Sequence, residues 1–281
     1  VDLGGIGLQG KFDFALGSKG DLQKPNSTVA ASAKVNLSGV NLQIPEQPPV
    51  NIGAMALTID STLGTDGAGG IAKVVSANVA VTSGDTPTER VLDLAATAQN
   101  LDLASNSVEQ FELTNLAISS LPKLVSQFGA FMPALKEQQI EIRDGQIYAN
   151  VAGSYDGKGQ TVTLRKPLSL STPNLTVAKA GAVLLDREKI VTQILGTIGL
   201  ASGVSADLSQ VSVTSSIFTL AKSDPPLQIR MSESGAMTGS GRLQLTANLV
   251  KLGAAIQALG ETPARVQNGT LVATIDLVGG I

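Results

Sequence analysis

The chain of 281 residues contains no cysteine, no histidine and no tryptophan. Without cysteine there is no disulfide bond and no thiol nucleophile, and without histidine the commonest acid–base group and the commonest metal ligand are missing. Most zinc, copper and haem sites of proteins depend on these two residue types. We therefore expect no such metal site, no cofactor, and no catalysis that rests on an imidazole or a thiol.

Charged and aromatic residues are also scarce. Charged residues make up 15% of the chain and aromatic residues 3%, whereas about 25% of the residues of a typical globular domain are charged. The net charge is −3, and lysine and arginine are scattered without a basic stripe. This distribution argues against binding to nucleic acid and against attraction to an anionic lipid surface.

Apolar and polar residues alternate along most of the sequence. Clear runs of alternation cover residues 35–44, 54–63, 74–82, 91–103, 111–118, 140–151, 162–177, 211–220, 227–231, 243–247 and 271–277. A period of two predicts strands with one buried and one wetted face. We therefore predict a mainly β fold of roughly ten to fourteen strands. The expected sheet is elongated, curved and mostly antiparallel, either a β-groove or an open sandwich.

Three segments instead carry apolar residues at helical spacing, namely 120–137, 186–198 and 249–259. Ser120 can cap the first helix, and Pro133 favours a break within it. The second has Asp186 as a cap and Gly199 as a stop, which makes it the cleanest amphipathic pattern of the three. We expect two or three short helices that pack on the sheet or cap it.

An Asn-Leu pair followed by polar–apolar alternation occurs four times, at Asn41, Asn100, Asn115 and Asn174, and the first interval equals the third. At each copy the apolar residues change from odd to even positions or the reverse. When the apolar positions shift by one residue, the apolar side chains move to the other face of the strand. An extra residue in a β-bulge or a bend keeps them on the same face. Bulges or bends are therefore predicted at or next to these four asparagines, and a series of them curls a sheet into a trough.

The apolar face of such a trough needs a cover. A second sheet gives a closed core, as in a structural or adhesive β domain, whereas an open face is a site for a lipid or a partner. The apolar residues that we expect to line an open face lie in the middle of the chain: Leu92, Leu94, Leu101, Leu103, Phe111, Leu113, Leu116, Ile118, Ile140, Ile142, Ile147, Leu168, Leu170, Leu175 and Val177.

No motif for catalysis or for nucleotide binding competes with this interpretation. The glycine-rich segments 4–7 and 67–70 lack the strand–helix context of a phosphate-binding loop. The sequence Asp156-Gly157-Lys158-Gly159 reads as a hairpin turn, because the further acidic ligands of a calcium loop are missing. Carboxylate pairs such as Glu137 and Glu141 stand in ordinary polar surroundings. We expect that the protein is not an enzyme.

The chain resembles the large AsmA-like and TamB-like proteins of the bacterial cell envelope. The resemblance rests on the Asn-Leu strands at 99–103 and 114–118. It also rests on the unit 121–124 (Leu-Pro-Lys-Leu) followed by 141–147 (Glu-Ile-Arg-Asp-Gly-Gln-Ile). It implies a repeating β-groove that passes phospholipid between membranes, in a periplasmic protein that is anchored in a membrane. The chain departs from this pattern in having no visible anchor and comparatively many helices.

The hypothesis from the sequence is thus a single elongated segment, 1–281, of a longer envelope protein. It begins at Val1 rather than at Met and shows no signal peptide or membrane span. We expect a phospholipid or another lipid with acyl chains as its partner, together with other envelope proteins, and no nucleic acid. The alternative is a non-catalytic extracytoplasmic β domain with a closed core.

Overall fold

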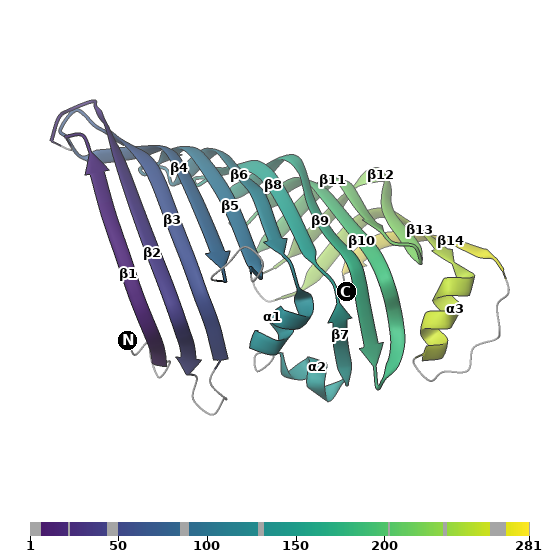
Figure 1. Ribbon diagram of the computed structural model, residues 1–281. Coiled ribbons are helices and arrows are strands. Elements are labelled where there is room, and N and C mark those ends of the chain that lie inside the picture. The colour runs from purple at the N-terminus through teal and green to yellow at the C-terminus, as the bar shows by residue number, and fades with distance from the viewer. Residues whose placement is uncertain are drawn as a thin grey trace.

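The computed structural model describes residues 7–21, 23–43, 50–84, 90–128, 132–201, 203–232, 235–258 and 268–280. Its strands form one sheet of 14 strands, and Figure 1 shows that the long strands bend along their length, so that the sheet is curled. Every pairing between named strands is antiparallel. The prediction of a curved, antiparallel, mainly β fold is confirmed.

The strands follow one another across the sheet in chain order, with one exception. The first seven along the sheet are β1 (Gly7–Lys19), β2 (Thr28–Gln43), β3 (Val50–Thr65), β4 (Ile71–Ser83), β5 (Leu92–Asp102), β6 (Ser107–Ile118) and β8 (Ile147–Asp156). The next six are β9 (Thr161–Lys179), β10 (Ala182–Gly199), β11 (Val204–Thr214), β12 (Phe218–Met231), β13 (Met237–Asn248) and β14 (Thr270–Gly280). The exception is the short strand β7 (Ile140–Asp144), which pairs with the last part of β9, while β8 pairs with the first part.

A single curled sheet buries little of its surface. The chain of 28.6 kDa exposes 16448 Å², whereas a compact protein of that mass exposes about 11,000 Å². Among the described residues the fully buried apolar side chains are mostly small, and the largest of them are Val29 and Val40. The fold therefore has no thick core in the part of the chain that the structure describes.

Two of the three helical predictions are confirmed. The segment 120–137 forms α1 (Leu121–Phe128) and α2 (Pro133–Glu137), with residues 129–131 outside the described part. The segment 249–259 forms α3 (Leu249–Ala258), and residue 259 lies outside the described part. No described helix is long and apolar enough to cross a membrane.

The predicted helix over 186–198 is wrong, because these residues form most of β10 and pair with β9 and β11. Four register shifts interrupt the β9 pairing, at Val183/Leu185, Leu185/Glu188, Glu188/Ile190 and Ile194/Thr197. The first two shifts place an extra residue in β10, and the last two place extra residues in β9. The segment is rich in Ile, Val and Thr, which favour a strand over a helix when partners are present on both sides.

The bulges predicted at the Asn-Leu pairs are found at three of the four. Register shifts lie next to Asn41, at Asn115 and at Asn174. Asn100 has a left-handed backbone with φ 52°, but around this residue β5 keeps its register with both β4 and β6. At the same level β4 gains one residue on β3 and β6 gains one residue on β8, so the register changes on the outer sides of β4 and β6 rather than at β5 itself.

The order of strands and helices repeats after six strands. The first unit runs β2-β3-β4-β5-β6-β8 and the second runs β9-β10-β11-β12-β13-β14. In each unit a helix follows the fifth strand and contacts the second: α1 follows β6 and contacts β3, and α3 follows β13 and contacts β10. The sheet is therefore built from two copies of one structural unit that lie edge to edge.

Local contacts recur at equivalent places of the two units. The N–H of Leu121 donates to the carbonyl oxygen of Gly145 at 2.9 Å, and the N–H of Leu249 donates to that of Gly269 at 3.1 Å. The two glycines have φ of 143° and 140°. Both leucines also begin a Leu-x-Lys-Leu sequence. These matches identify β14 as the equivalent of β8.

The first hairpin of each unit contains the same bulge. Two residues of β2 lie opposite one residue of β3 around Gly39, and two residues of β9 lie opposite one residue of β10 around Asn174. The left-handed residue has φ 58° in the first case and 56° in the second. The two units thus bend their first strands in the same way.

Candidate functional site

The cross-strand register places apolar residues on one face of the whole sheet. Directly paired residues of neighbouring strands point to the same face. One row of such pairs crosses thirteen strands, and twelve of its members are apolar: Phe14, Val35, Leu57, Val81, Leu94, Leu116, Ala149, Leu170, Thr192, Val213, Leu220, Leu245 and Ala273. We call this set the apolar row, and the side of the sheet that it occupies the apolar face.

A second row of direct pairs runs across the sheet closer to the opposite ends of the strands. It consists of apolar residues, Tyr155 and glycine: Val29, Leu63, Val74, Leu101, Val108, Tyr155, Val162, Ile198, Ala206, Ile229, Gly239 and Gly279. The apolar surface therefore crosses the sheet at two levels, from β1 to β14 in the apolar row and from β2 to β14 in the second row.

Most of the apolar face is half-buried rather than buried. In β13 the residues of this face are shielded by their neighbours, whereas the alternate polar residues are exposed. At the outer strand β1, Phe12 is 50% exposed, Phe14 70% and Leu16 76%. Within the described residues no second sheet covers this face. A closed core would instead bury side chains of this size almost completely.

The structure brings most of the predicted lining residues together on the apolar face. Those that lie in its pairing rows are Leu92, Leu94, Leu101, Phe111, Leu113, Leu116, Ile118, Ile147, Leu168 and Leu170. Those in β7 and the last part of β9 lie beside α1 at one end of the strands: Ile140, Ile142, Leu175 and Val177. Leu103 lies in the turn that follows β5, 42% exposed, and outside these rows.

The sequence reasoning missed both ends of the face. Phe12, Phe14 and Leu16 of β1 were not predicted, although they alternate with polar residues in the same way. It also missed the apolar residues from β10 to β14, because a helix was expected in place of β10. Both sets can be found by following, along the whole chain, whether apolar residues stand at odd or at even positions.

The helix α1 packs on the strands at one of their ends. Leu121 of α1 is only 7% exposed, and a Cβ on Gly145 would lie 3.0 Å from its Cδ1 atom and 3.1 Å from that of Leu175. The helix therefore packs on the strands through its first residue. Figure 1 shows α1, α2 and β7 between the lower parts of β3 and β9, where the strands between them are shorter.

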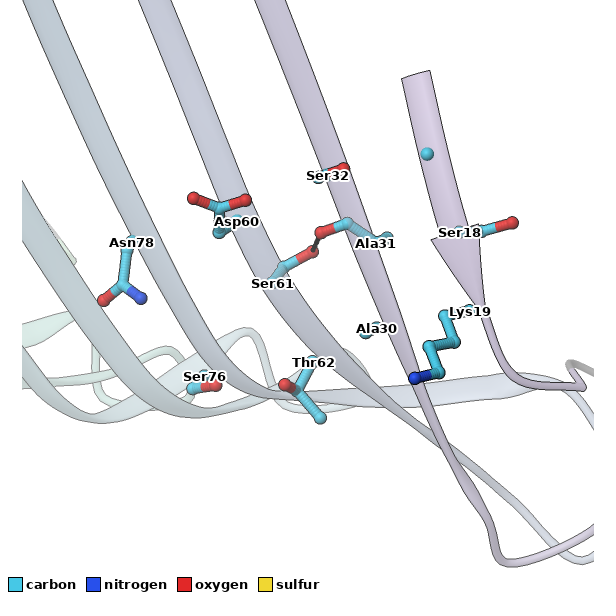
Figure 2. A pocket seen from close by; sticks show the side chains of 11 residues that line it. Ser18, Lys19, Ala30, Ala31, Ser32, Asp60, Ser61, Thr62, Ser76 and Asn78 are labelled. Carbon is cyan, nitrogen blue, oxygen red and sulfur yellow. Dashed lines mark hydrogen bonds between the residues drawn. The ribbon is translucent and has the colours of Figure 1, made fainter. Parts of the chain in front are cut away.

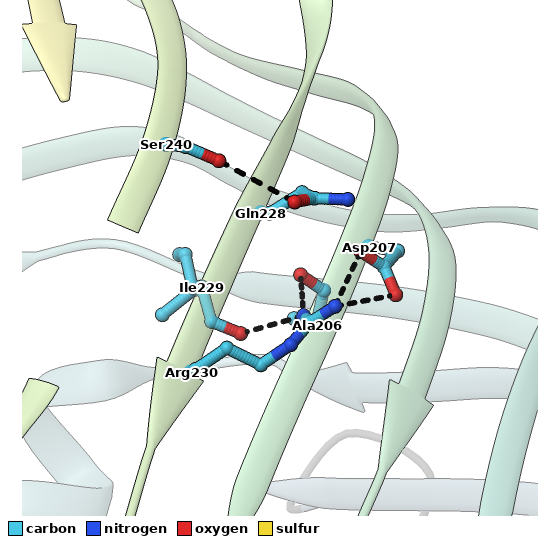
Figure 3. A network of polar contacts seen from close by, with 6 residues as sticks. All are labelled: Ala206, Asp207, Gln228, Ile229, Arg230 and Ser240. Carbon is cyan, nitrogen blue, oxygen red and sulfur yellow. Dashed lines mark hydrogen bonds and ion pairs between the residues drawn. The ribbon is translucent and has the colours of Figure 1, made fainter. Parts of the chain in front are cut away.

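The opposite face of the sheet is polar and carries exposed ion pairs. Figure 3 shows Arg230 of β12 donating to both carboxylate oxygens of Asp207 in β11, at 2.9 and 3.1 Å, and to the carbonyl oxygens of Ala206 and Ile229. The side chains of Arg230 and Asp207 are each nearly half exposed. Exposed pairs of this kind contribute about 1 kcal/mol or less, so they add little to stability.

Among the described residues, Asp102 and Arg242 have shifted pKa values. The Ser105 hydroxyl and the Ala104 N–H donate to the Asp102 carboxylate and lower its pKa. The hydrogen bond from Arg242 to Asp276 raises the pKa of the guanidinium. Both groups are on the surface, where such shifts accompany ordinary turns and ion pairs.

A shallow hollow on the polar face, shown in Figure 2, lies over β1 to β4. Its lining is made of small or polar residues, with Lys19 and Asp60 as the charged ones. Ligand pockets are usually lined by apolar side chains around a few convergent polar groups, and this hollow has no such lining. Among the described residues no group of three or more acidic side chains is placed to hold a metal ion.

Comparison with known proteins finds no matching family model, no matching curated protein and no matching solved structure. The apolar face is thus the candidate site that the described part of the chain itself presents.

Proposed function

We propose that the apolar face binds the acyl chains of a phospholipid or a similar lipid. The observation that carries the proposal is the apolar row, which crosses thirteen strands from β1 to β14 without a covering sheet in the described residues. Its side chains would replace the hydrocarbon of a bilayer around the acyl chain, at about 0.8 kcal/mol for each methylene group removed from water. The headgroup stays in water beyond the apolar rows.

The shape and chemistry of the face support a lipid over a compact ligand. The side chains are aliphatic, with few hydrogen-bond donors or acceptors, so they offer little to orient a polar molecule. The face is long in one direction, which suits a flexible chain. A role in lipid transfer within the bacterial cell envelope, as the resemblance to AsmA-like and TamB-like proteins implies, is part of this proposal. The same holds for a periplasmic location and for partners among envelope proteins.

A binding measurement with a matched pair of variants tests the proposal. The probe is phosphatidylethanolamine with a nitrobenzoxadiazole group on one acyl chain, whose fluorescence rises in apolar surroundings. Val81 lies in the apolar row, and its neighbour Ala80 is exposed on the polar face. We expect Val81→Asp to weaken binding at least tenfold and Ala80→Asp to leave it unchanged. Circular dichroism and thermal melts verify that both variants are folded.

Lipid extraction and native mass spectrometry of the unmodified chain provide a second readout. We expect co-purified lipid that is lost in Val81→Asp and kept in Ala80→Asp. If Val81→Asp does not fold, Val81→Asn takes its place with the same expectation. A folded wild-type chain that neither carries extractable lipid nor binds the probe would overturn the proposal, as would equal binding by both folded variants.

A further inference from the structure

The strand β14 forms one side edge of the sheet, and among the described residues it pairs only with β13. An unpaired edge presents a row of free N–H and C=O groups that can pair with another strand, and proteins usually protect such an edge with Lys, Pro or unpaired charges. β14 contains neither Lys nor Pro. Its one charged residue, Asp276, is held by Arg242 at 2.6 Å. The edge is therefore open to strand addition.

The internal repeat shows what kind of strand fits this edge. β14 is the equivalent of β8, since Gly269 and Gly145 precede the two strands with the same backbone conformation and the same hydrogen bond to a helix. In the apolar row Ala273 takes the place of Ala149. β8 does not end the sheet: its second edge pairs with β9, and Ala149 lies opposite Leu170. β14 lacks the neighbour that its equivalent has.

The exposure of β14 agrees with a missing neighbour. Leu271 and Ile275 are each 40% exposed, whereas their equivalents in β8, Ile147 and Val151, are partly buried. Ala149 is buried beside Leu170 of β9, and Ala273 is more exposed than Ala149. A strand of the β9 type would cover these side chains and extend the apolar row by one residue.

The edge strand β1 of a second copy does not fit this edge, and β14 of a second copy would carry the pattern of β8 rather than that of β9. The thirteen strands along the sheet alternate in direction, so β1 and β14 run the same way. Docking β1 of another copy on β14 would make a parallel pair in a sheet whose pairings are otherwise antiparallel. β2, the strand equivalent to β9, is already covered by β1.

We infer that the edge of β14 is a docking surface for the first strand of a further six-strand unit of the same type. The docking strand runs antiparallel to β14 and carries the pattern of β9, with an apolar residue opposite Ala273 as Leu170 is opposite Ala149. Addition of this unit continues the apolar face beyond β14. The inference rests on the repeat and on the free edge, not on the binding of lipid.

Register-specific disulfide formation tests the inference, and the absence of cysteine from the chain makes the experiment clean. The probe is a synthetic peptide with the sequence of β9, Thr161–Lys179, in which Leu170 is replaced by Cys and activated as a mixed disulfide with thionitrobenzoate, which leaves as the thiolate when the protein thiol attacks. The protein carries Ala273→Cys, and the matched control carries Thr274→Cys, which points to the opposite face. Facing residues of paired strands are close enough for a disulfide, and residues on opposite faces are not.

We expect the peptide to bind and to form the disulfide at least tenfold faster with Ala273→Cys than with Thr274→Cys. We also expect a scrambled peptide to react slowly with both. Equal rates with the two variants, or no difference between the β9 peptide and the scrambled one, would overturn the inference. Rapid formation of a protein dimer by Ala273→Cys without peptide would do so as well, because it would show that the edge pairs with a second copy. None of these readouts changes if the apolar face fails to bind lipid.

Discussion

Leu121 lies directly against Gly145, to whose carbonyl oxygen its backbone N–H donates at 2.9 Å. The glycine has φ 143°, a conformation that residues with a side chain rarely adopt, and a Cβ atom there would lie 3.0 Å from Cδ1 of Leu121. This pair joins the first turn of α1 to the beginning of β8. Leu249 and Gly269 join α3 to β14 in the same way, so the contact belongs to the repeating unit.

The first prediction concerns this contact. Gly145→Ala should lower the free energy of unfolding by about 2–4 kcal/mol, because it combines backbone strain with a displaced leucine. The control is Gly181→Ala, where φ is 86° but nothing lies within 4 Å of the added Cβ; it should cost about 1 kcal/mol from strain alone. Urea unfolding measures both. Equal losses in the two variants would contradict the packing role of Gly145.

A second prediction separates stability from lipid binding. Phe14 is 70% exposed, so Phe14→Ser should change the free energy of unfolding by less than about 0.5 kcal/mol. If the apolar row binds acyl chains, the same variant should weaken binding of the fluorescent lipid severalfold. Lys34→Ser, an exposed change on the polar face of the neighbouring strand, is the control and should leave binding unchanged. An unaltered affinity in Phe14→Ser would remove β1 from the binding face.

A third prediction concerns the ion pair between Glu112 of β6 and Lys166 of β9. Their charged atoms meet at 2.8 Å across β8, over Ala152, which is buried and pairs with both residues. Ala152→Leu should destabilise the protein by about 1–3 kcal/mol, since a larger side chain does not fit beneath the pair. Lys166→Met should cost about 1 kcal/mol or less, because Lys166 is exposed. A larger loss for Lys166→Met than for Ala152→Leu in thermal unfolding would show that the ion pair, not the packing, determines the effect.

The fourth prediction is a pH dependence from Asp102. Its pKa is lowered in the folded chain from an ordinary value of 3.8, first by the Ser105 hydroxyl and then by the Ala104 N–H. A lowered pKa means that the ionised carboxylate favours folding above pH 3.8, and that this contribution is lost as the pH falls through the lower folded value. Ser105→Ala should move the pKa of Asp102 back toward 3.8, as followed by NMR titration of the carboxyl carbon. An unchanged titration curve would mean that the Ser105 hydroxyl does not set this pKa.

The sequence by itself determined the fold class and the sidedness of the sheet. Strict alternation requires strands with two unlike faces, and its parity changes located the bulges at Asn41, Asn115 and Asn174. The same count placed residues such as Leu94 and Leu116 on one face, because a side chain's face in a strand depends only on its position and on the bulges before it.

The tertiary structure decided what local patterns leave open. It made 186–198 a strand, since pairing with β9 and β11 outweighs the helical spacing of its apolar residues. It left the apolar face without a second sheet in the described residues, because whether a face is covered depends on how distant strands are arranged. It also revealed the six-strand unit, whose equivalent contacts at Leu121 and Leu249 are set by hydrogen bonds to distant glycines. Alternation determines which residues share a face, but only the pairing of distant strands determines whether another element covers that face.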